Sequence, residues 1–354
     1  MEQNVVSDSI TGFKYAPNLK DDYEGLRQVN GPMMVSLDVT SRCNLSCIHC
    51  LNDSSNRGNS VYEEMNDRDI LMVVDQIIEL NPHTVCICGG EPLLRKNLFD
   101  IIDKFSQKGI FVSMVSNGFL IDSECVNKLK KCGLKFIQIS LDGVNKKQHD
   151  YFRGVQGSFD RAVSAIKLLV KAGFNVAVSF VPNKLNHKDF YEYVDFVNKL
   201  GVISVRVMPF LPLGRGNKFG KLLMLNEEEY FYFQRKIFRC AEIYRGKMDV
   251  EWGDPLDHYI RMKNNYKAGL KTYCVEIRAN GDIFFSTYMP IKIGNCLKKS
   301  LKEYWLNGLD NVWGNPTVIQ WVNKVKNIYD FEKLDPQPYF DTPIEIKLDN
   351  GGRI

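Results

Sequence analysis

Short, nearly continuous apolar runs alternate with stretches of helical periodicity from residue 32 to about residue 209. Such runs are typical of parallel strands that are covered on both faces. Six β/α units in series predict a right-handed parallel sheet, open or curled into a partial barrel. The expected strands are 33–39, 84–88, 110–116, 135–141, 174–181 and 203–209, and the expected helices between them are 66–80, 97–108, 122–132, 159–172 and 187–200.

The β/α alternation stops after residue 209, and a different pattern follows. Residues 227–245 have the periodicity of one helix, and 298–308 that of a shorter one. Between them, the dipeptide Asn280-Gly281 separates two apolar runs and predicts a β-hairpin. We therefore expect a small α+β domain after the β/α units. The expected segments are an N-terminal tail at 1–31, a core at 32–215, a linker with a helix at 216–270 and a C-terminal domain at 271–354.

Composition and charge exclude several classes of protein. The chain has 354 residues, 44% hydrophobic and 25% charged, which is typical of a folded globular protein. A net charge of +4 gives no argument for nucleic acid or a membrane as the main partner. No apolar stretch is long enough to span a bilayer, and no basic start precedes an apolar run. These features predict a cytoplasmic protein.

Three of the ten cysteines are crowded into one short segment. Cys43, Cys47 and Cys50 follow the first expected strand with the spacing C-x3-C-x2-C, so they could wrap a compact metal centre. Three thiolates are one short of a closed zinc site, but an iron–sulfur cube with one exposed iron requires this number. Two alternatives stay open: a zinc site completed by His49 or a distant residue, and three unrelated buried thiols.

Four further motifs follow the next strands in order, and together with the cysteines they resemble the radical SAM superfamily over residues 32–215. Each motif alone is a weak signal, but five in order behind the first four consecutive strands form a specific one. The motifs are Gly89-Gly90-Glu91-Pro92, Ser116-Asn117-Gly118, Ile139-Ser140-Leu141-Asp142-Gly143, and the run 149–154 followed by Gly157-Ser158-Phe159-Asp160.

The resemblance implies a partial (β/α)6 barrel that binds one 4Fe–4S cluster and S-adenosylmethionine (SAM). It implies that Glu91 accepts a hydrogen bond from the SAM ammonium and that Arg153 pairs with the SAM carboxylate. Ser116, Ser140 and Asp142 each have an alternative role as strand-end turn residues. The metal ligands would be Cys43, Cys47 and Cys50, and the cofactor-binding residues would be His49, Gly89, Gly90, Glu91, Ser116, Asn117, Ser140, Asp142 and Arg153.

The C-terminal region resembles the SPASM or twitch extension of radical SAM maturases, but it departs from that pattern. Ser286 stands where the pattern has a second cysteine, which predicts that the auxiliary clusters have been lost. The alternative is an irregular cluster that uses Cys240, Cys274 and Cys296. Without such a cluster, Cys274 or Cys240 becomes a candidate catalytic thiol that returns a hydrogen atom, although a packing role fits either. The thiols of Cys86 and Cys88 are expected in the core.

The resemblance implies an enzyme in which a 5′-deoxyadenosyl radical abstracts a hydrogen atom from a ribosomal peptide or related natural-product precursor. The reaction could be epimerisation, cross-linking or another maturation step, and a low-potential donor such as flavodoxin or ferredoxin would supply electrons. One alternative is a sugar, aminoglycoside or tetrapyrrole precursor as substrate. Another, from a different class of protein, is a metal-binding barrel without catalytic activity.

Overall fold

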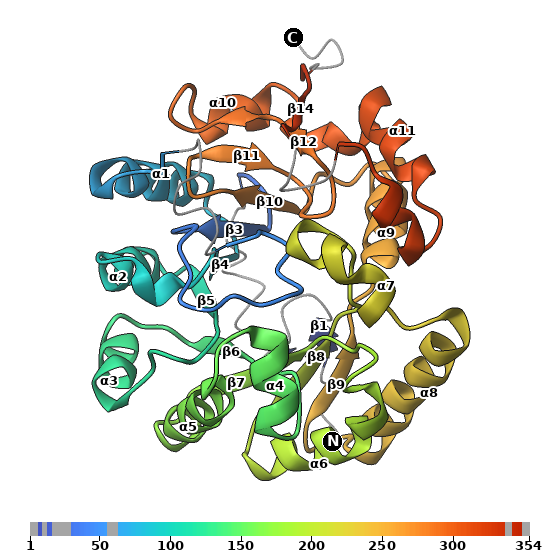
Figure 1. Ribbon diagram of the computed structural model, residues 1–354. Coiled ribbons are helices and arrows are strands. Elements are labelled where there is room, and N and C mark those ends of the chain that lie inside the picture. The colour runs from blue at the N-terminus through green and yellow to red at the C-terminus, as the bar shows by residue number, and fades with distance from the viewer. Residues whose placement is uncertain (1–5, 9–12, 16–29, 55–62, 337–341, 349–354) are drawn as a thin grey trace, which may run out of the picture.

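The computed structural model describes residues 6–8, 13–15, 30–54, 63–336 and 342–348. It is built on a curved ten-stranded sheet in the order β13-β11-β10-β3-β4-β5-β6-β7-β8-β9, with helices along the outer face (Figure 1). The sheet is not closed into a complete barrel, because β9 and β13 are its two edges. This confirms the expected α/β class and the partial barrel.

The six expected parallel strands are all present and pair in sequence order. Their nearly continuous apolar runs fit strands that are covered by helices on one side and by the barrel interior on the other. A seventh parallel strand, β9 (Asp249–Trp252), follows β8 and was not predicted. The six are β3 (Met34–Asp38), β4 (Thr84–Cys88), β5 (Phe111–Ser116), β6 (Phe136–Ser140), β7 (Asn175–Phe180) and β8 (Ser204–Val207).

The expected helices form with bounds close to those predicted. Polar caps fix several of their starts: Asn66 accepts hydrogen bonds from the first backbone N–H groups of α1, and Asp122 does so for α3. The observed helices are α1 (Asp67–Leu80), α2 (Leu98–Gln107), α3 (Ser123–Lys131), α5 (Ser158–Lys171), α6 (Phe190–Lys199), α8 (Glu227–Ile243) and α10 (Leu301–Leu306). Unpredicted helices are α4 (Lys146–Arg153), α7 (Gly220–Leu223), α9 (Pro255–Lys267) and α11 (Pro316–Lys324).

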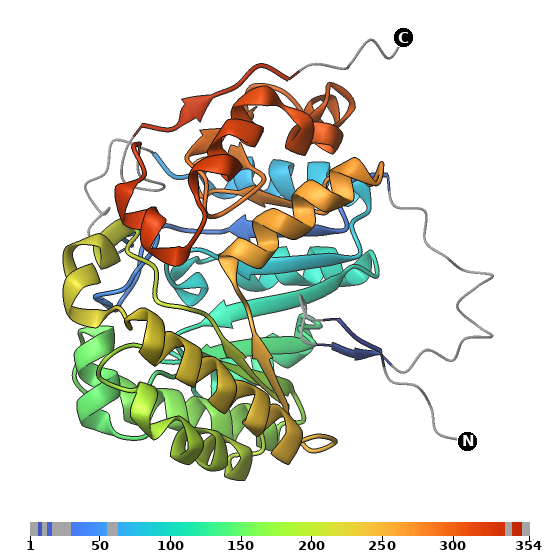
Figure 2. The ribbon, with the colours of Figure 1, turned by 90° about the vertical axis from the view of Figure 1, so that its right-hand side faces the viewer.

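The expected hairpin is formed by β10 (Cys274–Ile277) and β11 (Asp282–Phe284), with Gly281 at a φ of 84° in the turn. β10 also pairs in parallel with β3, so the hairpin extends the barrel sheet across the edge that β3 would otherwise expose. After the hairpin, α10 lies against α1 (Figure 2). The backbone N–H of Leu301, at the start of α10, donates to the side chain of Gln76 in α1 at 2.8 Å.

The remaining C-terminal elements are short. They are β12 (Ile291–Lys292), β13 (Gly294–Asn295), β14 (Ile344–Glu345) and the 3₁₀ turns Leu309–Gly314 and Ile328–Lys333. At the other end, most of the expected tail 1–31 lies outside the described residues, and its described part includes the paired strands β1 (Val6–Asp8) and β2 (Phe13–Tyr15). No helix in the described ranges is long and apolar enough to cross a membrane.

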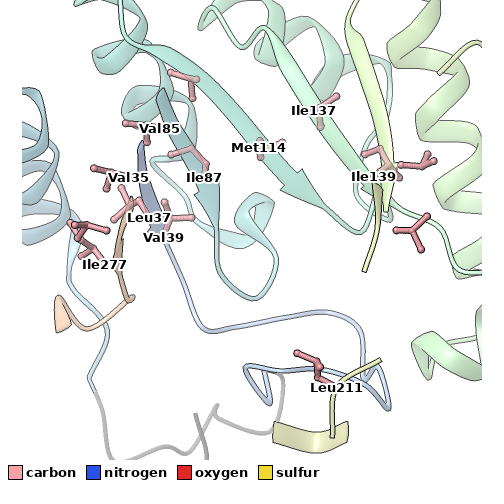
Figure 3. Close-up of a cluster of buried hydrophobic side chains, with 14 of the residues drawn as sticks. Val35, Leu37, Val39, Val85, Ile87, Met114, Ile137, Ile139, Leu211 and Ile277 are labelled. Carbon is pink, nitrogen blue, oxygen red and sulfur yellow. The ribbon is translucent and has the colours of Figure 1, made fainter. Parts of the chain in front are cut away.

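The main core lies between the sheet and its helices. Val35, Leu37, Val85 and Ile87 are fully buried there, on neighbouring strands (Figure 3). Because side chains alternate along a strand, Ser36, Cys86 and Cys88 are on the opposite, interior face. The interior face therefore carries polar and thiol groups.

Candidate active site

The cysteine loop, residues 39–54, runs from the end of β3 and is held by contacts from distant parts of the chain. Ile48 donates its backbone N–H to the carbonyl of Phe152 at 3.0 Å, and the Arg215 side chain donates to the carbonyl of Cys47 at 2.7 Å. Arg215 also pairs with Asp53 at 2.9 Å. These contacts fix the loop that carries the three cysteines.

A cavity of ≈ 270 Å³ opens beside this loop at the C-terminal ends of the barrel strands. Ligands in parallel α/β folds bind at this end of the strands. Glu91, Asp142, Cys240 and Cys274 do not line this cavity. The predicted residues that do are Cys43, Cys47, His49, Cys50, Gly89, Gly90, Ser116, Asn117, Ser140 and Arg153.

Hydrogen-bond donors surround the cysteine sulfurs. Cys43 Sγ accepts from the backbone N–H of Leu45 at 3.5 Å and from Asn117 Nδ2 at 3.9 Å, and Arg153 Nη1 lies 3.7 Å from Cys47 Sγ. Burial raises the pKa of Cys43 to about 11 and also raises that of Cys47. Such thiols ionise when a metal centre supplies positive charge.

These donors and the shared cavity fit an iron–sulfur cluster. Cys43, Cys47 and Cys50 are free thiols, and donors to sulfur stabilise the charge that cluster ligands carry. Within the described residues, no three His, Cys, Asp or Glu side chains form a group that could hold a metal ion. A four-iron cube binds each thiolate to a separate iron, so the fit rests on the cavity and the donors.

Gly89 and Gly90 bring the end of β4 against the cysteine loop. Gly89 has a φ of 128°, and a Cβ there would lie 2.3 Å from the carbonyl oxygen of Thr40. A Cβ on Gly90 would lie 2.1 Å from the carbonyl oxygen of Arg42. The backbone N–H of Gly90 donates to Thr40 at 2.8 Å. Glycine is therefore required at both positions for contact between two protein backbones, in addition to the cofactor approach expected from the sequence.

Glu91 lies beneath the cavity wall and joins two strand ends. Its fully buried carboxylate accepts hydrogen bonds from Ser116 Oγ at 2.9 Å, from the backbone N–H of Asn117 at 2.8 Å and from that of Leu93 at 3.3 Å. Burial raises its pKa to about 7, although these donors oppose the effect. In this structure the carboxylate positions the Ser116–Asn117 segment, and its expected contact with a ligand remains a prediction.

Arg153, at the end of α4, forms a buried ion pair. Its guanidinium donates to Asp142 at 2.7 and 2.5 Å, and the other Asp142 oxygen accepts from the backbone N–H of Val181 at 2.7 Å. Burial raises the pKa of Asp142, against the opposing attraction of Arg153. Asp142 thus orients Arg153 from the side away from the cavity. The guanidinium of Arg153 lines the cavity and is suited to bind an anionic ligand group.

His49 provides a flat surface in the cavity. Its ring stacks on Phe152 with centroids 4.0 Å apart and an interplanar angle of 3°. Burial lowers its pKa well below the usual value, so the ring is neutral, and its Nδ1 has no hydrogen-bond partner among the described residues. A buried polar atom without a partner at a cavity wall fits a bound ligand.

A second cavity of ≈ 190 Å³ lies deeper in the barrel, and Met208 lines both cavities. Cys274 lines this second cavity, whereas Cys240 is fully buried in α8 and lines neither. Sequence reasoning missed the contribution of α9, because only the folded chain brings this helix over the interior. The ionisable residues of the lining are Arg206, Asp254, Asp257, His258, Arg261 and Glu276.

The sequence of this chain is similar to that of radical SAM proteins. The sequence model of the Radical SAM superfamily matches residues 37–197. An AdoMet-dependent heme synthase of Methanosarcina barkeri is 26% identical over 298 residues, which are 80% of this chain and 84% of that protein. The mycofactocin maturase MftC of Mycolicibacterium smegmatis is 31% identical over 208 residues, 58% of this chain and 51% of its own length.

Solved structures share the fold. Streptococcus suis SuiB bound to S-adenosylmethionine superposes with a TM-score of 0.64 at 16% identity, covering 92% of this chain and 82% of SuiB. Native anSMEcpe with bound AdoMet has a TM-score of 0.60 at 17% identity, over 90% and 93% of the two chains. At these identities the likeness concerns the fold alone.

Proposed function

Because this chain is an enzyme of the radical SAM superfamily, we propose that it modifies a ribosomal peptide by abstracting a hydrogen atom from it. Members of this superfamily use a 4Fe–4S cluster and SAM, and one neighbouring fold has SAM bound. The finer parts of the proposal are the residue roles, the peptide substrate and a flavodoxin or ferredoxin as electron donor.

The proposed ligands of the cluster are Cys43, Cys47 and Cys50, which share one cavity wall. When bound, the cluster and SAM supply a carbon-centred radical that can abstract hydrogen. Arg153, already oriented by Asp142, would bind the carboxylate of SAM, and His49 would present its ring to the adenine. The barrel interior would keep water from the reacting groups.

The second cavity is the observation that supports a peptide substrate. Its ≈ 190 Å³ suits a side chain with its local backbone, and its lining mixes donors and acceptors. Asp254, Asp257 and Glu276 place three carboxylates there, beside the guanidinium groups of Arg206 and Arg261. A four-ring tetrapyrrole fills far more than this volume, whereas a peptide segment can insert one side chain and pair with groups of either sign.

A tetrapyrrole substrate is the second candidate, because the heme synthase of Methanosarcina barkeri matches over 84% of its length. Anaerobic reactions with SAM would compare two probes: synthetic peptides from short reading frames beside the gene, and Fe-coproporphyrin III. We expect the mass or deuterium content of a peptide to change, and the Cys43→Ala variant to leave it unchanged. Conversion of the porphyrin with every peptide unchanged would overturn the peptide proposal.

A further inference from the structure

Two thiols face each other on β4, on the interior face of the barrel. Cys86 Sγ lies 3.4 Å from Cys88 Sγ, and both residues are free and only partly buried. Ile87 between them is fully buried toward the helices, which places the two cysteines on the same opposite face. Sequence analysis expected them in the core, but the structure places them in the interior beside the cavities.

The pair lies between the first cavity and residues of the second. Cys88 lines the first cavity, together with the cysteine loop and Gly89. Cys86 lines neither cavity, but it lies close enough to Arg206 and Cys274, which line the second cavity, for electrostatic interaction with both. A radical formed in the first cavity would therefore be near the Cys88 thiol.

Strand register separates this pair from Cys274. Cys274 is level with Met34 and Thr84, and Cys88 lies four residues further toward the cysteine loop. At about 3.3 Å per residue, that is about 13 Å along the strand. Cys88, which lines the first cavity, is thus nearer to the proposed SAM site than Cys274 is, and Cys240 lines neither cavity.

The environments of the two sulfurs suit different roles. The hydrogen bond from Cys88, assisted by one from Ser113 and by the charge of Arg206, lowers the pKa of Cys86 to about 7. The same contact with Cys86, together with burial, raises the pKa of Cys88. The pair therefore holds one thiol that stays protonated beside one that readily becomes a thiolate.

We propose that Cys86 and Cys88 form a redox-active dithiol that donates a hydrogen atom to a radical in the barrel and closes to a disulfide. Residues two apart on a strand have Cα atoms about 6.6 Å apart, which lies within the range that a disulfide tolerates. The sulfurs need to approach by about 1.4 Å, from 3.4 Å to the S–S bond length of about 2.0 Å. Rotation of two side chains is sufficient for such a movement.

Cys88–SH gives its hydrogen atom to the carbon radical, a C–H bond forms, and a thiyl radical remains on Cys88. The Cys86 thiolate, having released its proton to solvent, bonds to this thiyl. The extra electron leaves to an oxidised one-electron carrier of the flavodoxin class, and a soluble dithiol later reduces the disulfide. This inference rests on the proposed radical function.

The first test measures whether Cys86 and Cys88 can form a disulfide when no radical is generated. The cluster-loaded protein would be incubated anaerobically with excess oxidised glutathione, alkylated and digested with trypsin. The fragment 69–95 contains these two cysteines and no other. We expect it to appear unalkylated and two hydrogens lighter, while Cys132, a buried thiol on the outer helix layer, is alkylated in full after denaturation. A fragment 69–95 that is fully alkylated would overturn the proposal.

The second test uses SAM and a limiting amount of reduced flavodoxin in heavy water, without substrate, so that exchanged S–D groups label the 5′-deoxyadenosine that forms and the oxidised flavodoxin accepts the extra electron. Wild type and Cys132→Ser should give deuterated product with oxidised 69–95, whereas Cys86→Ser and Cys88→Ser should lose the oxidised fragment, and Cys88→Ser should also lose the label. Unlabelled deoxyadenosine from wild type would overturn the dithiol alone. Absence of deoxyadenosine from wild type would overturn the radical function and the dithiol together.

Discussion

The buried carboxylate of Glu91 makes stability depend on pH in a way that one substitution removes. Glu91 is fully buried and its pKa is raised from 4.5 to about 7 by burial. The Glu91→Gln variant keeps the size of the side chain but cannot ionise. Its amide also fits the three surrounding donors less well, so the variant is expected to be less stable at every pH.

The sign and size follow from the pKa difference. Between pH 4.5 and 7 the folded protein binds the Glu91 proton more tightly than the unfolded chain does. The stability linked to this proton is fully present below pH 4.5 and is lost as the pH rises through 7. A shift of about 2.5 units corresponds to about 3 kcal/mol over the whole range, of which roughly 2 to 3 kcal/mol falls between pH 5 and pH 8.

Urea unfolding of the cluster-free protein at pH 5 and pH 8 measures this effect. The free energy of unfolding of wild type should fall relative to that of Glu91→Gln by roughly 2 to 3 kcal/mol between the two values. Glu228→Gln, on the exposed surface of α8, serves as the matched control and should follow wild type. If the difference in the free energy of unfolding between wild type and Glu91→Gln does not change with pH, Glu91 does not have a raised pKa.

Two further substitutions test the walls of the cavity. Asp142→Ala leaves the charge of Arg153 buried without its partner carboxylate. We therefore expect the free energy of unfolding, measured in urea, to fall by about 3–5 kcal/mol. The exposed Lys199→Ala variant should change stability little, and equal effects of the two would contradict a buried ion pair. Gly90→Ala would push the end of β4 away from the cysteine loop, so reconstituted protein should hold much less iron. A Cβ on Gly246 would meet no other atom, although its φ of 80° strains an alanine, so Gly246→Ala should lose some stability but keep the wild-type iron content. Normal iron in Gly90→Ala would contradict the close approach.

Local sequence patterns were sufficient where structure depends on neighbouring residues. The six apolar runs of the barrel became strands, and Asn280-Gly281 became a hairpin turn, because both depend on local periodicity and turn geometry. The strand β9 was missed because its four residues include Asp249 and Glu251, which interrupt the apolar pattern. The pairing of β10 with β3 joins segments some 240 residues apart in sequence, which no local pattern reveals.

The candidate site shows the same division. Motifs at successive strand ends indicated which residues would gather, because parallel strands end at one edge. They did not indicate which atoms face the cavity: Glu91 and Asp142 lie behind its wall, where they hold Asn117 and Arg153. The dithiol of Cys86 and Cys88 was also invisible, because alternating cysteines on a strand fit a core as well as an interior.

An anaerobic reconstitution decides whether this protein holds a single cluster that cleaves SAM. The protein would be loaded with iron and sulfide, reduced and given SAM, while iron per chain and 5′-deoxyadenosine are measured. We expect about four irons per chain, together with deoxyadenosine that is absent from the Cys50→Ala variant. About eight irons would contradict the single cluster, and a loaded protein that forms no deoxyadenosine would contradict the radical reaction itself.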